Sequence, residues 1–132
     1  MALQIGDAFQ KHNPTASDHV YFICSTRSAA GTVVWINMTS VRSYTIDFAC
    51  RLKVGDHRSV EHDSVMYYAG AGLVSLERLE WRVFTAKDLL RLPTASDQLL
   101  QRIRQGAIDS AYTPDEVRDA IEACPWAPKA GA

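Results

Sequence analysis

The sequence has few cysteines, and they do not follow a metal-binding or redox pattern. The three cysteines are Cys24, Cys50 and Cys124, and no two of them form a C-x-x-C pair. Their odd number argues against a closed disulfide framework. Cys24 and Cys50 lie inside apolar runs, where a free thiol usually packs as a small hydrophobic side chain. We therefore expect free, buried thiols and a reducing compartment.

Long apolar runs are also missing. No window approaches the roughly 20 residues that a membrane-spanning helix needs, and MALQIGDAF has no basic segment followed by an apolar one. The expectation is a cytoplasmic protein without a membrane partner. The glycine pattern excludes further classes, because Gly70-Ala-Gly72 lacks the third glycine of a dinucleotide fingerprint and no P-loop or G-x-S-x-G elbow occurs. We expect no nucleotide cofactor and no nucleophilic triad.

Neither sign of charge dominates. The 14 basic and 15 acidic residues give a net charge of -1, so the whole molecule exerts no strong pull on nucleic acid. Residues 1–60 carry six basic and four acidic side chains, a local balance of +2. This excess permits RNA binding on one face without predicting it.

Hydrophobic periodicity predicts one α+β domain. Apolar, β-branched runs predict strands over residues 19–24, 32–39, 44–52, 65–69 and 73–76. Capping patterns predict helices over 85–92, after Ser96, and from a Thr113 N-cap with Pro114 and Glu116 to Cys124. We expect residues 1–84 to be mainly β, 85–124 to form a helical cover and 125–132 to be a frayed tail. The order favours a small antiparallel barrel or a strongly curled sheet followed by C-terminal helices.

The helix after Ser96 has one apolar stripe. Its inward side chains recur at three- and four-residue spacing and are Leu99, Leu100, Ile103, Ala107 and Ile108. The opposite face is expected to carry Arg102, Arg104 and Gln105. In the last helix, Val117, Ala120 and Ile121 are expected to point inward.

The segment RLKVGDHRSVEHDSV, residues 51–65, gathers unusual chemistry between two apolar runs. A Gly-Asp turn among charges is typical of a solvated hairpin loop, yet two histidines also suit catalysis or nucleic-acid binding. A metal site is a third reading, since Asp56, His57, His62 and Asp63 are possible ligands. H-x4-H fits no common structural zinc pattern, so we expect no metal.

Several short motifs together resemble the MazF/PemK group of toxin ribonucleases. They are Ile5-Gly-Asp-Ala-Phe9, a strand ending Ile23-Cys-Ser25, and Val33-Val-Trp-Ile-Asn-Met-Thr-Ser40. His19, with Gly55-Asp-His57 and His62-Asp-Ser64, is similar to a histidine-containing branch of that group. The resemblance covers residues 5–68.

The resemblance implies an SH3-like β-barrel, a homodimer, an antitoxin partner and metal-independent cleavage of single-stranded RNA. In that family a threonine or serine at the end of the third strand, matching Thr39 or Ser40, works with an arginine in the loop after the opening strand. Here the loop QKHNPTASDH has no arginine. Lys11, His12 or His19 would have to replace it.

RNA cleavage without a metal needs a base for the 2′-hydroxyl, an acid for the leaving oxygen, and cations for the phosphate. Imidazole suits both proton transfers. The candidate catalytic residues are His19, His57, His62 and Thr39, and the candidate RNA-binding residues are Lys53, Arg58, Ser40 and Lys11. Tyr21, Tyr44 and Tyr67 are candidates either for base stacking or for core packing.

A second hypothesis needs no catalysis. The same fold occurs in a relative that poisons gyrase, so fold alone does not decide activity. The chain would then be a module that binds a protein partner, an antitoxin or an inhibited cellular target, by a sheet edge or groove. The missing loop arginine favours this hypothesis, whereas the histidines favour the nuclease.

Overall fold

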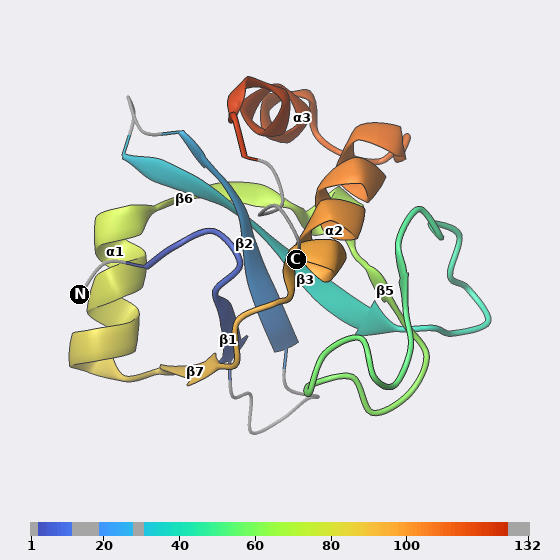
Figure 1. Ribbon diagram of the computed structural model, residues 1–132, viewed down its shortest axis with the longest axis horizontal. Helices are drawn as coiled ribbons and strands as arrows, with labels where there is room; N and C mark the ends of the chain where they lie inside the picture. The colour runs from blue at the N-terminus through green and yellow to red at the C-terminus, as the bar shows by residue number, and fades with distance from the viewer. Residues whose placement is uncertain (1–2, 12–18, 28–30, 127–132) are drawn as a thin grey trace.

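The computed structural model describes residues 3–11, 19–27 and 31–126, which form an α+β fold with one antiparallel sheet and C-terminal helices (Figure 1). The strands are β1 Ala8–Lys11, β2 His19–Arg27, β3 Thr32–Ser40, β4 Arg51–Leu52, β5 Ser64–Met66, β6 Gly72–Ser75 and β7 Leu89–Leu92. The described helical elements are the short 3-10 turn η2 Tyr68–Gly70, α1 Leu76–Trp81, the π-helical segment η3 Arg82–Ala86, α2 Asp97–Asp109 and α3 Asp115–Ala123. His12 and residues 127–132 of the expected frayed tail lie outside the described part.

β3 is the centre of the sheet. The strand order is β4-β5-β3-β2-β1-β7, and β6 also pairs with β3. Because β2 occupies one edge of β3, the other edge is divided between β6, opposite Thr32, and β5, opposite Ser40. Among the described residues β4 and β7 do not pair, so the sheet is open. The curled-sheet expectation is confirmed, and the sheet is not closed into an SH3-like barrel.

Alternation along the strands gives the sheet two different faces. Ala8, Phe22 and Ile36 are paired across β1, β2 and β3, and all three are fully buried. They belong to the main core, which α2 and α3 complete. On the opposite face a smaller cluster that includes Phe9 and Ile23 packs against α1 and η3. The described sheet is therefore covered on one face by the C-terminal helices and partly covered on the other by α1.

α2 and α3 form where capping and periodicity predicted helices. The Ser96 hydroxyl caps α2 by accepting the backbone N–H of Leu99, as expected. The predicted Thr113 cap is wrong, because α3 has Pro114 at its N-cap position without a side-chain cap, and the Thr113 hydroxyl is buried without a partner in the described structure. Ile108, expected inside, is 36% exposed.

Residues 85–92 differ from the sequence prediction. The helix lies earlier, at α1, where the Ser75 hydroxyl accepts the N–H of Arg78. η3 follows and ends at Lys87 with φ 56, a left-handed residue that stops the helical turn. Leu89–Leu92 is then a strand because the open edge of β1 provides backbone partners for it. The expected strand over 44–52 is also shorter, and only Arg51–Leu52 pairs.

Arg104 was expected on the exposed face of α2 but lies on its buried face. Its guanidinium is buried and donates to the carbonyls of Cys24, Ile121 and Cys124. The cation also lies 5.3 Å from the ring centre of Trp126. Cys24 lies at the bulge where the register of β2 shifts. Arg104 therefore joins α2 to the bulge and to the end of α3.

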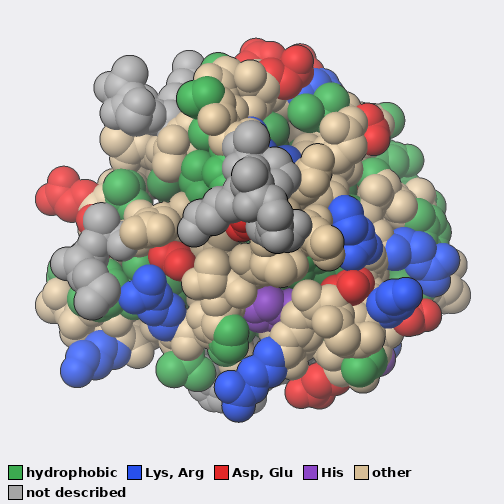
Figure 2. Space-filling model, viewed as in Figure 1, with side chains coloured by type: hydrophobic (Ala, Val, Ile, Leu, Met, Phe, Trp, Pro, Cys, Tyr) green, Lys and Arg blue, Asp and Glu red, His purple; other side chains and the backbone are tan. Residues whose placement is uncertain are grey.

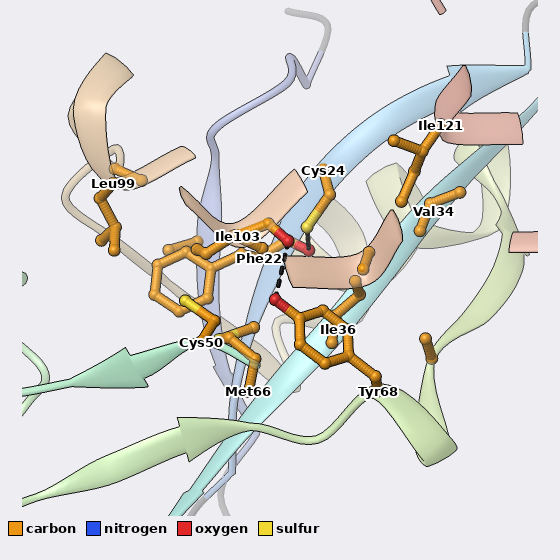
Figure 3. Close-up of a cluster of buried hydrophobic side chains, with 14 of the residues drawn as sticks. Phe22, Cys24, Val34, Ile36, Cys50, Met66, Tyr68, Leu99, Ile103 and Ile121 are labelled. Atoms are coloured by element: carbon orange, nitrogen blue, oxygen red, sulfur yellow. Dashed lines mark hydrogen bonds between the residues drawn. The ribbon is translucent and has the colours of Figure 1, made fainter. Parts of the chain in front are cut away.

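α2 lies very close to the segment that follows β5. The Tyr68 hydroxyl crosses the core and donates to the Ile103 carbonyl at 2.7 Å (Figure 3). A Cβ atom added at Gly106 would overlap the Tyr68 hydroxyl and lie 3.0 Å from the Cβ of Cys50. Only glycine therefore allows this approach of the helix.

Replacing Gly106 with alanine tests this contact. In an ordinary helix interior Gly→Ala stabilises by about 1 kcal/mol. Here we expect Gly106→Ala to lower the free energy of unfolding by about 1–3 kcal/mol through overpacking. Urea denaturation gives the value. The double variant Gly106→Ala/Tyr68→Phe removes the overlapping oxygen and should recover part of the loss, whereas a stabilised Gly106→Ala would contradict the close approach.

The cysteines have the free state that their context predicted. Cys24 and Cys50 are buried, and Cys124 is half-buried. Burial raises the pKa of the Cys24 and Cys50 thiols. At Cys124 partial burial opposes ionisation, but hydrogen bonds with Ser25 and Thr26 and the nearby Arg104 charge bring the net pKa below its usual value.

This difference predicts the order of thiol modification. Only a thiolate attacks disulfide reagents, so Cys124 should react with such a reagent in the native protein while Cys24 and Cys50 react only on unfolding. Absorbance with an aromatic disulfide counts the modified thiols. Cys124→Ser should remove the native phase. A native phase that survives in this variant would contradict the buried placement of the other two.

Candidate functional site

Three strands bring hydroxyl and imidazole groups to one end of the sheet. Val20 pairs with Met38, so His19, the first residue of β2, lies beside Thr39 near the end of β3. On the other side of β3, Ser40 pairs with Ser64 at the start of β5. In Figure 1 the end of β3 and the start of β2 lie at the same end of the molecule, away from α1. His19 and Thr39, which are 20 positions apart in the sequence, are thus neighbours in the sheet.

His62 reaches this place from the loop before β5. Its Nε2 lies 2.5 Å from the Ser40 hydroxyl oxygen. Backbone contacts fix the approach, because the Val41 N–H donates to the Asp63 carbonyl and the Ser64 hydroxyl donates to the His62 carbonyl. The loop therefore presents the His62 imidazole to the end of β3.

We call the resulting hollow the imidazole cavity. It has a volume of about 500 Å³ and lies over the ends of β2 and β3. Its lining includes two imidazoles, hydroxyls, a guanidinium and a carboxylate, from His19, Thr39, Ser40, Arg42, Glu61 and His62. His19, Thr39, Ser40 and His62 are thus brought together as the sequence hypothesis required.

His57 is not part of this cavity. It is 7% exposed, and its ring forms a T-shaped pair with the Phe22 ring, with the ring centres 5.1 Å apart. Nε2 lies 2.7 Å from the Pro93 carbonyl, which only accepts, so Nε2 carries the hydrogen. Nδ1 then accepts from the Ser59 hydroxyl and backbone N–H, at 2.6 and 3.2 Å. The proposed proton-transfer role of His57 is replaced by a structural one.

Of the four expected RNA-binding residues, only Ser40 lines the imidazole cavity. Lys53 lies in a turn in which Gly55 has φ 105. The backbone N–H of Lys53 donates to the Asp56 carboxylate, and this carboxylate forms an ion pair with Arg102 at 3.3 Å. Arg58 is exposed and lines neither this cavity nor the one beside it. Lys11 is exposed at the end of β1, paired in register with His19. It lies near the cavity without lining it.

A second cavity adjoins the first, and we call it the tyrosine cavity. It measures about 440 Å³ and shares His19, Thr39, Ser40 and Tyr44 with the imidazole cavity. Three aromatic rings, an aliphatic side chain, an amide and a carboxylate contribute to its lining, from Tyr44, Tyr67, Tyr112, Ile46, Asn37 and Asp47. The Ser110 hydroxyl donates to Asp47 at 2.7 Å and ties the loop after β3 to the α2–α3 connection.

Sequence reasoning missed Arg42 and Tyr112. Arg42 brings to the cavity the guanidinium that the loop after β1 lacks, and its only signal was its place two residues after Ser40. Tyr112 lies in the α2–α3 connection, where nothing marked it as functional. Among the described residues no three His, Cys, Asp or Glu side chains gather as a metal site, and no helix there is long and apolar enough to cross a bilayer.

Comparison with protein-family models, curated proteins and solved structures finds no match to this chain. The resemblance to the MazF/PemK group therefore stays a prediction from short motifs.

The two histidines of the GDHRSVEH segment should respond differently to substitution. His57→Ala loses three hydrogen bonds and leaves a hole, so we expect the free energy of unfolding to fall by about 2–4 kcal/mol. His62→Ala removes an exposed side chain and should change stability by less than about 0.5 kcal/mol. Thermal and urea denaturation measure both. Equal, small effects would contradict the buried placement of His57.

Proposed function

We propose that this chain is a metal-independent endoribonuclease that cleaves single-stranded RNA with His19 and His62 as its proton-transfer pair. The observation that carries the proposal is that both imidazoles line one cavity, and that His62 is hydrogen-bonded there to the Ser40 hydroxyl. Two imidazoles beside hydroxyl donors and one guanidinium form the minimal set for phosphodiester transesterification.

The reaction balances without an added reagent. One imidazole takes the proton of the 2′-hydroxyl while that oxygen forms a bond to phosphorus. The other, as imidazolium, gives its proton to the 5′-oxygen as the P–O5′ bond breaks. The products are a 2′,3′-cyclic phosphate and a 5′-hydroxyl. In this proposal the Thr39 and Ser40 hydroxyls and the Arg42 cation, which line the same cavity, contact the non-bridging oxygens.

Substrate retention depends on local contacts in this proposal. Figure 2 shows acidic and basic side chains interspersed over the face that carries α2, and the net charge is -1. Such a surface attracts a phosphate backbone only weakly. Contacts within the cavities would therefore have to hold RNA, which favours short single-stranded substrates over duplexes.

The biological role that we propose is that of a toxin paired with an antitoxin, acting as a homodimer in the cytoplasm. It is supported by the motifs around Gly6-Asp7, Thr39-Ser40 and His62-Asp-Ser64. Arg42 would then replace the guanidinium of the family's loop arginine.

A non-catalytic module remains the second candidate. Tyr44 and Ile46 are 79% and 71% exposed on the loop after β3, and large exposed apolar side chains often mark a protein interface. This alternative predicts growth arrest or a stable complex while cellular RNA stays intact.

Cleavage of single-stranded RNA in the presence of EDTA tests the proposal. We expect His19→Ala and His62→Ala each to reduce the rate by about 10²–10⁴-fold, because each removes one proton-transfer group. Trp81→Ala, at an exposed residue of α1 that lines neither cavity, is the control and should stay within a few-fold of the original rate. Melting temperatures confirm that the variants fold.

Two results would contradict the nuclease. Cleavage that persists in both histidine variants would show that other groups, or a contaminant, act on the RNA. Intact RNA together with capture of one specific protein would support the binding module instead.

A further inference from the structure

The tyrosine cavity gathers aromatic rings from three distant segments. Tyr44 comes from the loop after β3, Tyr67 follows β5, and Tyr112 lies between α2 and α3. They are 79%, 48% and 46% exposed. None of these rings is needed to fill the core, and aromatic side chains exposed around one hollow are typical of a binding surface.

The cavity adjoins the proposed reaction site. His19, Thr39, Ser40 and Tyr44 line both cavities, so the two hollows lie side by side at the same end of the sheet. A nucleotide chain whose phosphate lies between His19 and His62 would place a neighbouring nucleotide at the tyrosines. The two volumes, about 500 and 440 Å³, lie in the range of about 300–1,000 Å³ that small-molecule sites occupy.

The lining suits a base better than a phosphate. Asp47 places a carboxylate in the tyrosine cavity, held there by the Ser110 hydroxyl and the Ala49 N–H, and its charge would repel a phosphate. Asn37 offers an amide, which pairs with the donor and acceptor groups on base edges. Arg42 lines the imidazole cavity and not this one. The imidazole cavity also has a carboxylate, from Glu61, but there the Arg42 guanidinium and the His62 imidazole accompany it, and neither of these two groups lines the tyrosine cavity. The basic groups therefore distinguish a phosphate side from a base side.

We propose that the tyrosine cavity binds an unpaired nucleobase of the RNA, next to the phosphate that is cleaved. Tyrosine rings stack on the base, and Asn37 contacts its edge. The proposal rests on the nuclease function for its substrate, and it adds the site that positions this substrate. A protein partner on the same tyrosines is the competing outcome.

Binding of uncleavable RNA tests the base site apart from catalysis. The probes are fluorescent 2′-fluoro RNA heptamers of A, C or U, and an abasic sugar-phosphate heptamer of equal length and charge. We expect at least one base-bearing probe to bind about 5- to 150-fold more tightly than the abasic one, the range for a single base–aromatic stack. Tyr44→Ala and Tyr112→Ala should each remove most of this difference.

Trp81→Ala provides the matched control, because Trp81 is 52% exposed on α1 and lines neither of the two cavities. It should keep the full difference, and unchanged melting temperatures should accompany all three substitutions. Equal binding of abasic and base-bearing probes, or a difference that both tyrosine variants retain, would overturn the base site.

Cleavage of ordinary RNA by the same preparations separates the two proposals. Cleavage of RNA without any contribution of the bases to binding would support the nuclease proposal and overturn the base-site proposal. Base-dependent binding without cleavage keeps the base site and removes the nuclease. Binding of a protein through Tyr44 and Tyr112, with no preference among the RNA probes, overturns the base site in favour of the interaction module.

Discussion

The hydrogen bonds of the buried His57 imidazole hold the loop between β4 and β5 against the rest of the protein. They join this loop to the Pro93 carbonyl, directly after β7, and to Ser59 within the loop itself. Five residues later the same loop delivers His62 to Ser40. The His57 imidazole thus fixes the loop, whereas the His62 imidazole is exposed and does not pack in the core. The contacts of His57 hold the middle of the loop, and the Val41–Asp63 hydrogen bond with the pairing of Ser40 and Ser64 holds its end, next to His62.

The remainder of the architecture supports the opposite wall of the cavities. β3 is held on both edges, by β2 along its length and by β5 near Ser40, so Thr39 and Ser40 lie on a fixed backbone. α2 approaches β5 closely because Gly106 leaves room for Tyr68, and Arg104 anchors the same helix to the bulge at Cys24. The loop that carries Tyr44 is tied to the end of α2 through Asp47 and Ser110. Paired strands and hydrogen-bonded loops therefore present both cavities.

Local patterns in the sequence predicted much of the fold. Alternation of β-branched residues located β2 and β3, and the Ser96 cap with its apolar stripe located α2. Residues 89–92 were misassigned because a leucine-rich run suits a helix or a strand, and only the open edge of β1 decides between them. Arg104 could not be placed inward from its charge, since the carbonyls that surround it come from β2 and α3. The gathering of His19, Thr39, Ser40 and His62 agreed with the sequence hypothesis, but periodicity cannot separate His57 from His62 in an irregular loop.

The proposed function depends on His19 and His62 acting on one phosphate while His57 serves the fold. NMR spectra of the three imidazole side chains during titration with a nucleoside 3′-monophosphate, which resembles the product of RNA cleavage, measure this division directly. The account predicts that the resonances of His19 and His62 shift together along one binding curve and that those of His57 stay in place. Movement of His57 with the ligand, or a response confined to only one of the two cavity histidines, would contradict it.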